Sequence, residues 1–420
     1  SNFSPDAKKW GYEFIMFFND GGGAVFFQHS STTTTKAKRD YFKISSWLSV
    51  FILFESNSNP KVIIIMAAME DAVEIHSQVE ESQYKLVPKL TISENSSEIF
   101  AVRFSPDGKF LAAGCGDGAI RVFNVSNGKV AYNLEGGSNV ALPTTCIRFR
   151  PVTPSSRTKN VFLSANAAGA VQHWHMTSGK CLHSFSDEEN QVYALDYNEE
   201  GSQFVTAGKD TKIRVYDEAT KTTVITMEGG TAGDFSKISP GHSNRVFSVK
   251  CTHDEHIVLS GGWDNTVQVW DIRTGIAVRS LYGPHICGDA LDLKGNEIVT
   301  GSWRPKDQLE LWDFGSGERI TEIPWNAGQS QFAANTQQSC MLYAAQFSKD
   351  SMGRFIVAGG SGSNEAKVFD HMAGNAVVGT VTGLTRGVFS VDFSPDGEKV
   401  AIAGGDSCIR ILDVVSKRDD

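Results

Sequence analysis

One repeating unit governs the sequence from residue 82 onward and constrains the fold more than any other feature. Each unit begins with a short alternating strand and a tight turn, followed by a strand of small residues that ends in Ala-Gly or Gly-Gly. A turn that often carries Asp then leads to a third strand of the form Ile-x-Val-aromatic-Asp. The third strands end near Asn124, His175, Asp217, Asp271, Asp313, Asp370 and Asp413, at spacings of 51, 42, 54, 42, 57 and 43 residues. Seven such ends predict seven units.

These units predict an all-β protein, a seven-bladed β-propeller over residues 82–420. A lone four-stranded sheet cannot bury both of its faces, whereas seven sheets placed radially pack on one another and leave only short edges. The turns at residues 105–108 and 394–397 carry Ser-Pro-Asp-Gly, in which Pro presets φ and Gly accepts a positive φ. The long spacings hold loop insertions, at residues 151–159, 229–240 and 324–338.

The last unit lacks a fourth strand, because only seven residues follow Asp413. Residues 84–90, just before the first unit, resemble a strand and belong to no unit. We expect this segment to be the fourth strand of blade seven, so that the N-terminal strand closes the ring by pairing with the C-terminal unit. Pro88 removes one ladder donor from the segment, which an outer edge strand tolerates.

Residues 1–81 do not share the repeat and predict an irregular N-terminal extension. They contain a glycine run, a threonine run and apolar bursts without a steady period of 2 or 3.6. The first position is not Met, whereas the residues after Met66 and Met69 form an acidic, polar stretch typical of a protein start. We expect residues 1–65 to be translated upstream sequence that is not part of the working protein; the alternative is a genuine, weakly ordered extension.

The composition narrows the function classes. A formal net charge of −9 disfavours a nucleic-acid binder, which usually carries a basic face. The 7 cysteines are scattered and never occur as C-x-x-C, which favours reduced thiols in the cytosol or nucleus over disulfides or zinc sites. The longest apolar run, residues 47–54, is far shorter than the ~20 residues of a membrane span.

The units resemble WD40 repeats, and unit four is the most specific match. It carries Gly-His before its first strand and Trp-Asp at the end of its third strand. The resemblance covers about residues 82–420 and implies a structural tetrad of hydrogen-bonded side chains inside blade four, made by His242, Ser260, Asp264 and Trp270. Buried Asp and His side chains are costly unless each has a partner, so a closed network satisfies both and stiffens the blade.

Other units keep only parts of this tetrad, so we expect blade four to be the stiffest. Three units retain an aspartate at the turn position, namely Asp117, Asp210 and Asp406. The same units replace the tryptophan of the third strand, by Phe123, Tyr216 and Leu412.

Catalytic and metal-binding interpretations are weaker. A Ser, a His and an Asp in one repeat suggest a hydrolase triad, but no nucleophile elbow of the G-x-S-x-G type is present. His173 and His175 would share one face of a strand, as a metal pair would, but no third ligand is evident. A phosphate loop of the G-x-x-x-x-G-K type is also absent. The sequence predicts a protein without catalytic residues, metal or cofactor, with an enzyme as the runner-up class.

The end of unit four suggests one interaction site. Residues 258–273 resemble the W-D-x-R box of WD40 substrate receptors for cullin-RING ubiquitin ligases, in which Arg273 would lie just past the third strand and reach a carboxylate of the ligase adaptor. The alternative is that most of the box is simply a well-formed repeat. The following unit breaks the box, because Gly315 stands where the Arg would be.

Aromatic residues near the start of the innermost strands suggest a second site. They recur in five units, as Phe100, Tyr193, Phe247, Tyr343 and Phe389, while the other two units have Thr145 and Asp289 there. This pattern resembles WD40 readers of histone tails, which hold a methylated lysine or an arginine at the channel mouth. Asp289 would add a negative charge that favours a cation. The alternative is that the rings pack against each other and plug the channel.

The function predicted from these features is that of a non-catalytic scaffold for protein–protein interaction. It would bind other proteins or basic peptides on its faces or channel mouth, as a monomer within a larger complex, without direct contact to nucleic acid or membrane. The two alternatives are a substrate receptor of a cullin-RING ligase and a reader of methylated or basic histone-like tails. The expected location is cytoplasmic, nuclear or both.

Overall fold

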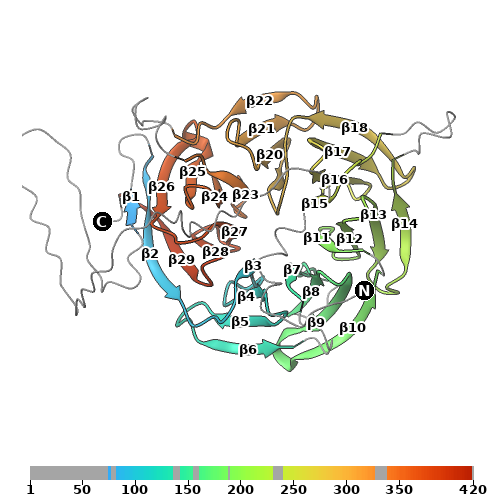
Figure 1. The fold of residues 1–420 in the computed structure, drawn as a ribbon, viewed down its shortest axis with the longest axis horizontal. Helices are drawn as coiled ribbons and strands as arrows, with labels where there is room; N and C mark the ends of the chain where they lie inside the picture. Colours follow the sequence, from blue (N-terminus) through green and yellow to red (C-terminus); the bar gives the residue numbers. More distant parts are fainter. Residues whose placement is uncertain are drawn as a thin grey trace, which may run out of the picture. The chain divides into compact units, whose positions relative to one another are not determined.

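The computed structural model contains seven β-sheets arranged around a common axis, which confirms the all-β, seven-bladed propeller (Figure 1). The structure describes residues 74–76, 82–135, 142–154, 160–187, 190–229, 240–326 and 338–418. The expectations for residues 1–65, and most of the three expected insertions, lie outside the described residues.

Each blade has four antiparallel strands ordered from the axis outward. The innermost strands are β3 (Ile99–Phe104), β7 (Thr144–Phe149), β11 (Val192–Tyr197), β15 (Val246–Cys251), β19 (Leu291–Lys294), β23 (Met341–Phe347) and β27 (Val388–Phe393). The second strands are β4 (Phe110–Cys115), β8 (Val161–Asn166), β12 (Gln203–Gly208), β16 (Ile257–Gly262), β20 (Glu297–Gly301), β24 (Phe355–Ser361) and β28 (Lys399–Gly404).

The third and fourth strands complete each blade. The third strands are β5 (Ile120–Asn124), β9 (Ala170–His175), β13 (Ile213–Asp217), β17 (Thr266–Asp271), β21 (Leu309–Asp313), β25 (Ala366–Asp370) and β29 (Ile409–Ser416). Six of them end at the residue that the repeat spacing indicates, and β29 runs three residues further. The outer strands are β6 (Val130–Leu134), β10 (Lys180–Ser186), β14 (Thr223–Met227), β18 (Ile276–Tyr282), β22 (Arg319–Glu322), β26 (Ala376–Thr382) and β2 (Tyr84–Ile92).

Three further elements lie outside this scheme. β1 (Glu74–His76) pairs antiparallel with β26 as a fifth strand of blade six, within the segment for which the sequence predicts no regular element. Two short 3-10 helices, η2 (Met176–Ser178) and η3 (His371–Ala373), follow the third strands of blades two and six. None of the helices in the described ranges is long and apolar enough to cross a membrane.

The antiparallel order of the strands defines two faces of the propeller. The turns between second and third strands, such as residues 263–265 before β17, lie on what we call the upper face. The turns between first and second strands, such as residues 252–256 before β16, lie on the lower face, together with the turns that precede the outer strands. Each innermost strand therefore starts at the upper face and ends at the lower face.

Small residues in the second strands let neighbouring blades approach closely. A Cβ atom added to Gly114 in β4 would lie 2.8 Å from Thr144 Cγ2 of the next blade. The same addition to Gly359 in β24 would lie 2.7 Å from Val388 Cγ1. Because real Cβ contacts are longer than this, the Ala-Gly and Gly-Gly endings of the repeat reflect the packing of one blade against the next.

Pairing of β2 with β29 closes the ring, as predicted (Figure 1). Leu86 is 5% exposed and packs with blade six residues such as Val378, and Ile92, also 5% exposed, packs with Ile99 of blade one. β2 therefore joins blade seven to both of its neighbours. The register shifts between Pro88 and Leu90, so the missing donor of the proline falls at an irregularity of the ladder.

We predict that deleting residues 1–92 destabilises the propeller strongly, whereas deleting residues 1–81 leaves it folded. The longer deletion removes β2, and loss of the buried Leu86 and Ile92 side chains alone should lower the free energy of unfolding by about 3–6 kcal/mol. Urea denaturation of both truncated proteins measures the difference. Equal unfolding midpoints would show that β2 does not hold the ring together.

Candidate interaction sites

Four polar side chains of blade four form one hydrogen-bonded chain. Trp270 Nε1 donates to Ser260 Oγ at 2.7 Å, and His242 Nε2 lies 2.6 Å from the same oxygen. The other ring nitrogen, His242 Nδ1, lies 2.8 Å from Asp264 Oδ2. Because a carboxylate only accepts, His242 Nδ1 donates to Asp264, and His242 Nε2 and Ser260 Oγ share the next hydrogen bond. Every member of the expected tetrad therefore has a partner.

The network keeps Asp264 ionised. Burial by itself would raise the pKa of Asp264, but hydrogen bonds from His242, the Ser243 amide and Thr266 outweigh burial and lower the pKa below its usual value. A lowered pKa in the folded state stabilises the protein above the pKa of an unfolded aspartate. This contribution is lost as the pH falls through the folded-state pKa of Asp264.

Other blades use simpler pairs at the same positions. Trp174 Nε1 donates to Ser164 Oγ in blade two, and Trp312 Nε1 donates to Thr300 Oγ1 in blade five, both at 3.0 Å. In blades one, three and seven the turn aspartate instead pairs with an arginine four residues later, as in Asp117–Arg121, Asp210–Arg214 and Asp406–Arg410. The sequence signal Asp-x-x-x-Arg could have revealed this substitute for the histidine.

Charged side chains from opposite blades meet in the channel. Asp289 of blade five forms ion pairs with Arg103 of blade one and with Arg148 of blade two, the latter at 2.7 Å. It also accepts hydrogen bonds from Gln346 at 2.9 Å and Ser248 at 3.4 Å. Burial and the neighbouring charge of Arg148 lower the pKa of Arg103 to about 10, still far above neutral pH. Asp289 is therefore fully engaged inside the protein.

Further ion pairs complete this channel network. Arg148 Nε lies 3.3 Å from Asp196, Lys250 lies 2.8 Å from Asp292, and Lys349 lies 2.8 Å from Asp392. With the pairs of Asp289, the network contains four cations and four carboxylates, so the charges of the described members cancel.

The five aromatic residues of the channel mouth separate into two groups. Phe100 stacks on Phe389 with ring centroids 5.5 Å apart, and Tyr343 meets Phe389 edge-on at 5.5 Å. On the other side, Tyr193 stacks on Phe247 at 4.8 Å. The first group comes from blades six, seven and one, and the second group comes from blades three and four. Blade two, which carries Thr145, and blade five, which carries Asp289, lie between the two groups (Figure 1). Thr145 Oγ1 donates a hydrogen bond to the Val192 carbonyl at 2.6 Å.

Comparison with protein families decides the classification. The model described as "WD domain, G-beta repeat" matches residues 179–217, 233–271 and 375–413, and each match ends at the Asp that closes the repeat pattern of a third strand. The model described as "Anaphase-promoting complex subunit 4 WD40 domain" matches residues 59–151. The chain belongs to the WD40-repeat family.

The curated relatives of this WD40 protein are distant and have varied names. "Cell division cycle 20.1, cofactor of APC complex" of Arabidopsis thaliana is 17% identical over 61% of this chain and 54% of its own length. "THO complex subunit 6 homolog" of Danio rerio is 27% identical over 44% of this chain and 56% of its own. "Pre-mRNA-processing factor 19" of Oryza sativa subsp. japonica is 22% identical over 81% of this chain and 58% of its own length. The chain spans roughly half the length of the curated relatives it matches.

Arg273 lies on the lower face of the WD40 propeller, in the turn after β17. Its Nε and Nη2 donate to the two oxygens of Asp271 at 3.1 and 2.8 Å, and its own amide also donates to that carboxylate. The side chain remains 60% exposed. Asp271 thus holds the guanidinium in a defined orientation while leaving much of it accessible to solvent.

Two tryptophans that the sequence reasoning missed extend the aromatic groups of the WD40 channel mouth. The ring centroid of Trp263 lies 5.5 Å from that of Phe247 and 6.0 Å from that of His285, on which Trp263 stacks. The ring centroids of Trp303 and Tyr343 lie 6.2 Å apart. Both tryptophans are only partly buried. Trp263 directly follows the glycine that ends β16, and Trp303 lies two residues after the glycine that ends β20. This shared position in the repeat could have placed both tryptophans on the upper face.

The two histidines considered as a metal pair have separate partners. His173 Nε2 lies 2.9 Å from Glu218 Oε2 of blade three, whereas His175 Nδ1 lies 2.8 Å from Ser178 Oγ. Burial lowers the pKa of His173 even though the hydrogen bond to Glu218 opposes that shift. Among the described residues, no group of three or more His, Cys, Asp and Glu side chains is arranged to hold a metal ion.

We predict that Ser260→Ala destabilises the propeller more than the matched change Ser164→Ala. Both serines are buried, but loss of Ser260 leaves His242 Nε2 and Trp270 Nε1 without partners, whereas loss of Ser164 affects only Trp174 Nε1. At about 1–3 kcal/mol for each unsatisfied group, the expected losses are about 2–6 and about 1–3 kcal/mol. Chemical denaturation measures both, and equal losses would argue against a cooperative tetrad.

Proposed function

We propose that this WD40 propeller is a non-catalytic scaffold that binds partner proteins or basic peptides on its faces, as a monomer within a larger complex of the cytosol or nucleus. The observation that carries the proposal is the concentration of aromatic side chains around a channel that ion pairs cross. Tryptophan, tyrosine and arginine are the residues that most often dominate binding energy at protein interfaces. The printed names of two relatives, a "cofactor of APC complex" and a "THO complex subunit 6 homolog", are consistent with work inside assemblies.

The upper channel mouth is the site that we assign to a basic peptide. Phe100 and Phe389 are only half-buried, so part of each ring is accessible from the upper face. The π face of an aromatic ring attracts an arginine, a lysine or a methylated lysine. Because two arginines compensate the charge of Asp289, the preference for a cation has to come from the rings. A peptide side chain would then enter between the two aromatic groups rather than pass down the channel.

We predict that Phe389→Leu and Phe100→Leu each weaken binding of an arginine- or lysine-containing peptide about tenfold, because both rings are half-buried and leucine preserves apolar volume but has no π face. Tyr282→Leu is the matched control, since Tyr282 is an exposed aromatic residue on the outer strand β18. Fluorescence polarisation with a basic-peptide library measures the affinities, and denaturation midpoints show whether the variants fold. A library without a binder, or equal losses for all three variants, would refute the assignment.

Arg273 supports a second candidate function, that of a substrate receptor for a cullin-RING ubiquitin ligase. The specific observation is the exposed guanidinium that Asp271 orients on the lower face. Hydrogen bonds from Arg273 lower the pKa of Asp271 to about 2, so this carboxylate stays ionised throughout the physiological range. An arginine held in this way can offer its remaining donors to a carboxylate of the ligase adaptor.

We predict that Arg273→Ala abolishes co-purification of the ligase adaptor while the propeller remains folded. Arg273→Lys keeps the charge but loses the planar fork, so it should also lose most of the adaptor. Quantitative mass spectrometry after affinity capture measures the adaptor, and circular dichroism checks the fold. If the wild-type chain captures no adaptor, or if both variants capture as much as the wild type, Arg273 has no role in ligase assembly.

A further inference from the structure

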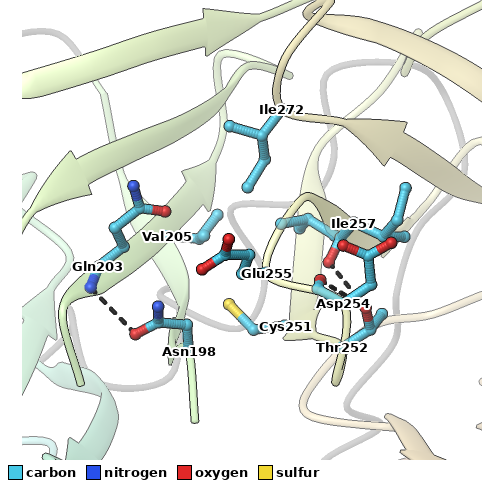
Figure 2. A pocket seen from close by; sticks show the side chains of 10 residues that line it. Asn198, Gln203, Val205, Cys251, Thr252, Asp254, Glu255, Ile257 and Ile272 are labelled. Atoms are coloured by element: carbon cyan, nitrogen blue, oxygen red, sulfur yellow. Dashed lines mark hydrogen bonds between the residues drawn. The ribbon is translucent and has the colours of Figure 1, made fainter. Parts of the chain in front are cut away.

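A small pocket opens on the lower face where blade three meets blade four (Figure 2). Blade three contributes the turn after β11 and the start of β12. Blade four contributes the turn between β15 and β16 and the residue that follows β17. Figure 2 shows the side chain of Glu255 between the residues of the two blades, with Asn198 and Val205 on one side and Asp254 and Ile257 on the other.

The inner wall of this pocket is apolar. Val205 and Val258 belong to the buried core between the two blades, and Ile257 and Ile272 are partly exposed above them. An aliphatic chain that entered the pocket would cover the exposed parts of both isoleucines. Burial of such apolar surface favours binding in proportion to the area removed from water.

Several polar groups of the pocket already serve the backbone of the turns. Asn198 Oδ1 accepts from the amides of Ser202 and Gln203, at 2.9 and 3.0 Å, and Asn198 Nδ2 donates to Ser202 Oγ. Thr252 Oγ1 donates to the carbonyl of Asp254. These groups shape the pocket and are committed to that role.

The two carboxylates give the pocket its charge. Asp254 uses one oxygen to accept from the His256 amide, and the side chain of Glu255 is 66% exposed, with His256 Nε2 3.6 Å from its carboxylate. No lysine or arginine belongs to the pocket lining. Arg273, on the same face, is held by Asp271 in its own turn, and its charge also interacts with Asp254. The lining therefore carries two carboxylates and no lysine or arginine above an apolar wall.

We propose that this pocket binds an arginine or lysine side chain of a partner protein. The aliphatic stem of such a side chain lies on Ile257 and Ile272, and its charged head meets Asp254 and Glu255. Long basic side chains combine these two properties, because they bury their stems and keep their heads in polar surroundings. The proposal rests on the scaffold function, since a partner protein supplies the side chain, but the pocket lies on the face opposite the channel mouth.

Methyl-labelled NMR of the full chain tests the pocket. The probes are four pentapeptide mixtures with a fixed central residue, either arginine, lysine, citrulline or norleucine, and random neutral flanks. The arginine and lysine mixtures should shift the methyl signals of Val205, Ile257 and Ile272, and the citrulline and norleucine mixtures should not. The double variant Asp254→Asn/Glu255→Gln should weaken this response about tenfold, because it removes both charges that face the ligand.

Glu398→Gln is the matched control, because Glu398 lies on the lower face in blade seven with a side chain that is 72% exposed. It should leave the response unchanged, as should the mouth variant Phe389→Leu. Equal shifts with the norleucine mixture, or an unaltered response in the double variant, would overturn the pocket. Shifts confined to methyl groups at the channel mouth, such as Val246, would overturn the pocket alone. Absence of any shift on either face would overturn the pocket and the peptide site at the channel mouth together.

Discussion

The pairing of β2 with β29 is the constraint on which the rest of the propeller depends. Six blades are built from consecutive strands, and each can form by local hairpins. The seventh blade needs a strand from the other end of the repeat region, so the ring exists only when residues more than 300 positions apart in sequence meet. Closure then brings blade one opposite blade five, which places Arg103 within reach of Asp289. The channel network is thus a product of the ring, and no single blade contains it.

Within the ring, the blades satisfy their buried polar groups in three different ways. Blade four joins four side chains in a chain of hydrogen bonds. Blades two and five keep only a tryptophan with a hydroxyl partner, and blades one, three and seven pair the turn aspartate with an arginine. Because the cost of a buried polar group depends on whether it has a partner, and less on which partner, these solutions are interchangeable in the same fold.

The architecture was readable from the sequence because each element of the repeat is local. The turn residues, the alternating strands and the small residues of the second strand recur at intervals of about fifty residues. Pro88 was compatible with an outer edge strand, where a missing backbone donor is tolerated. The tetrad of His242, Ser260, Asp264 and Trp270 could be named because unit four resembles a WD40 repeat, and the resemblance implies it. The partners of Asp289 could not be predicted, since they depend on which residues face each other across the channel. The grouping of the aromatic residues and the pocket beside Glu255 depend likewise on how adjacent blades pack, which no spacing within one unit encodes.

The ion pairs of the channel network lie between the two proposed binding faces of the propeller. A ligand at the aromatic groups above and a ligand beside Arg273 or Glu255 below are separated by ion pairs that neither one has to break. Binding energies at distant sites without shared contacts add with little interference. Two partners at the sites proposed above would therefore bind with little effect on each other's affinity. A chain that bound partners at both proposed sites would join them by tethering, which raises the local concentration of each near the other without any signal passing between them.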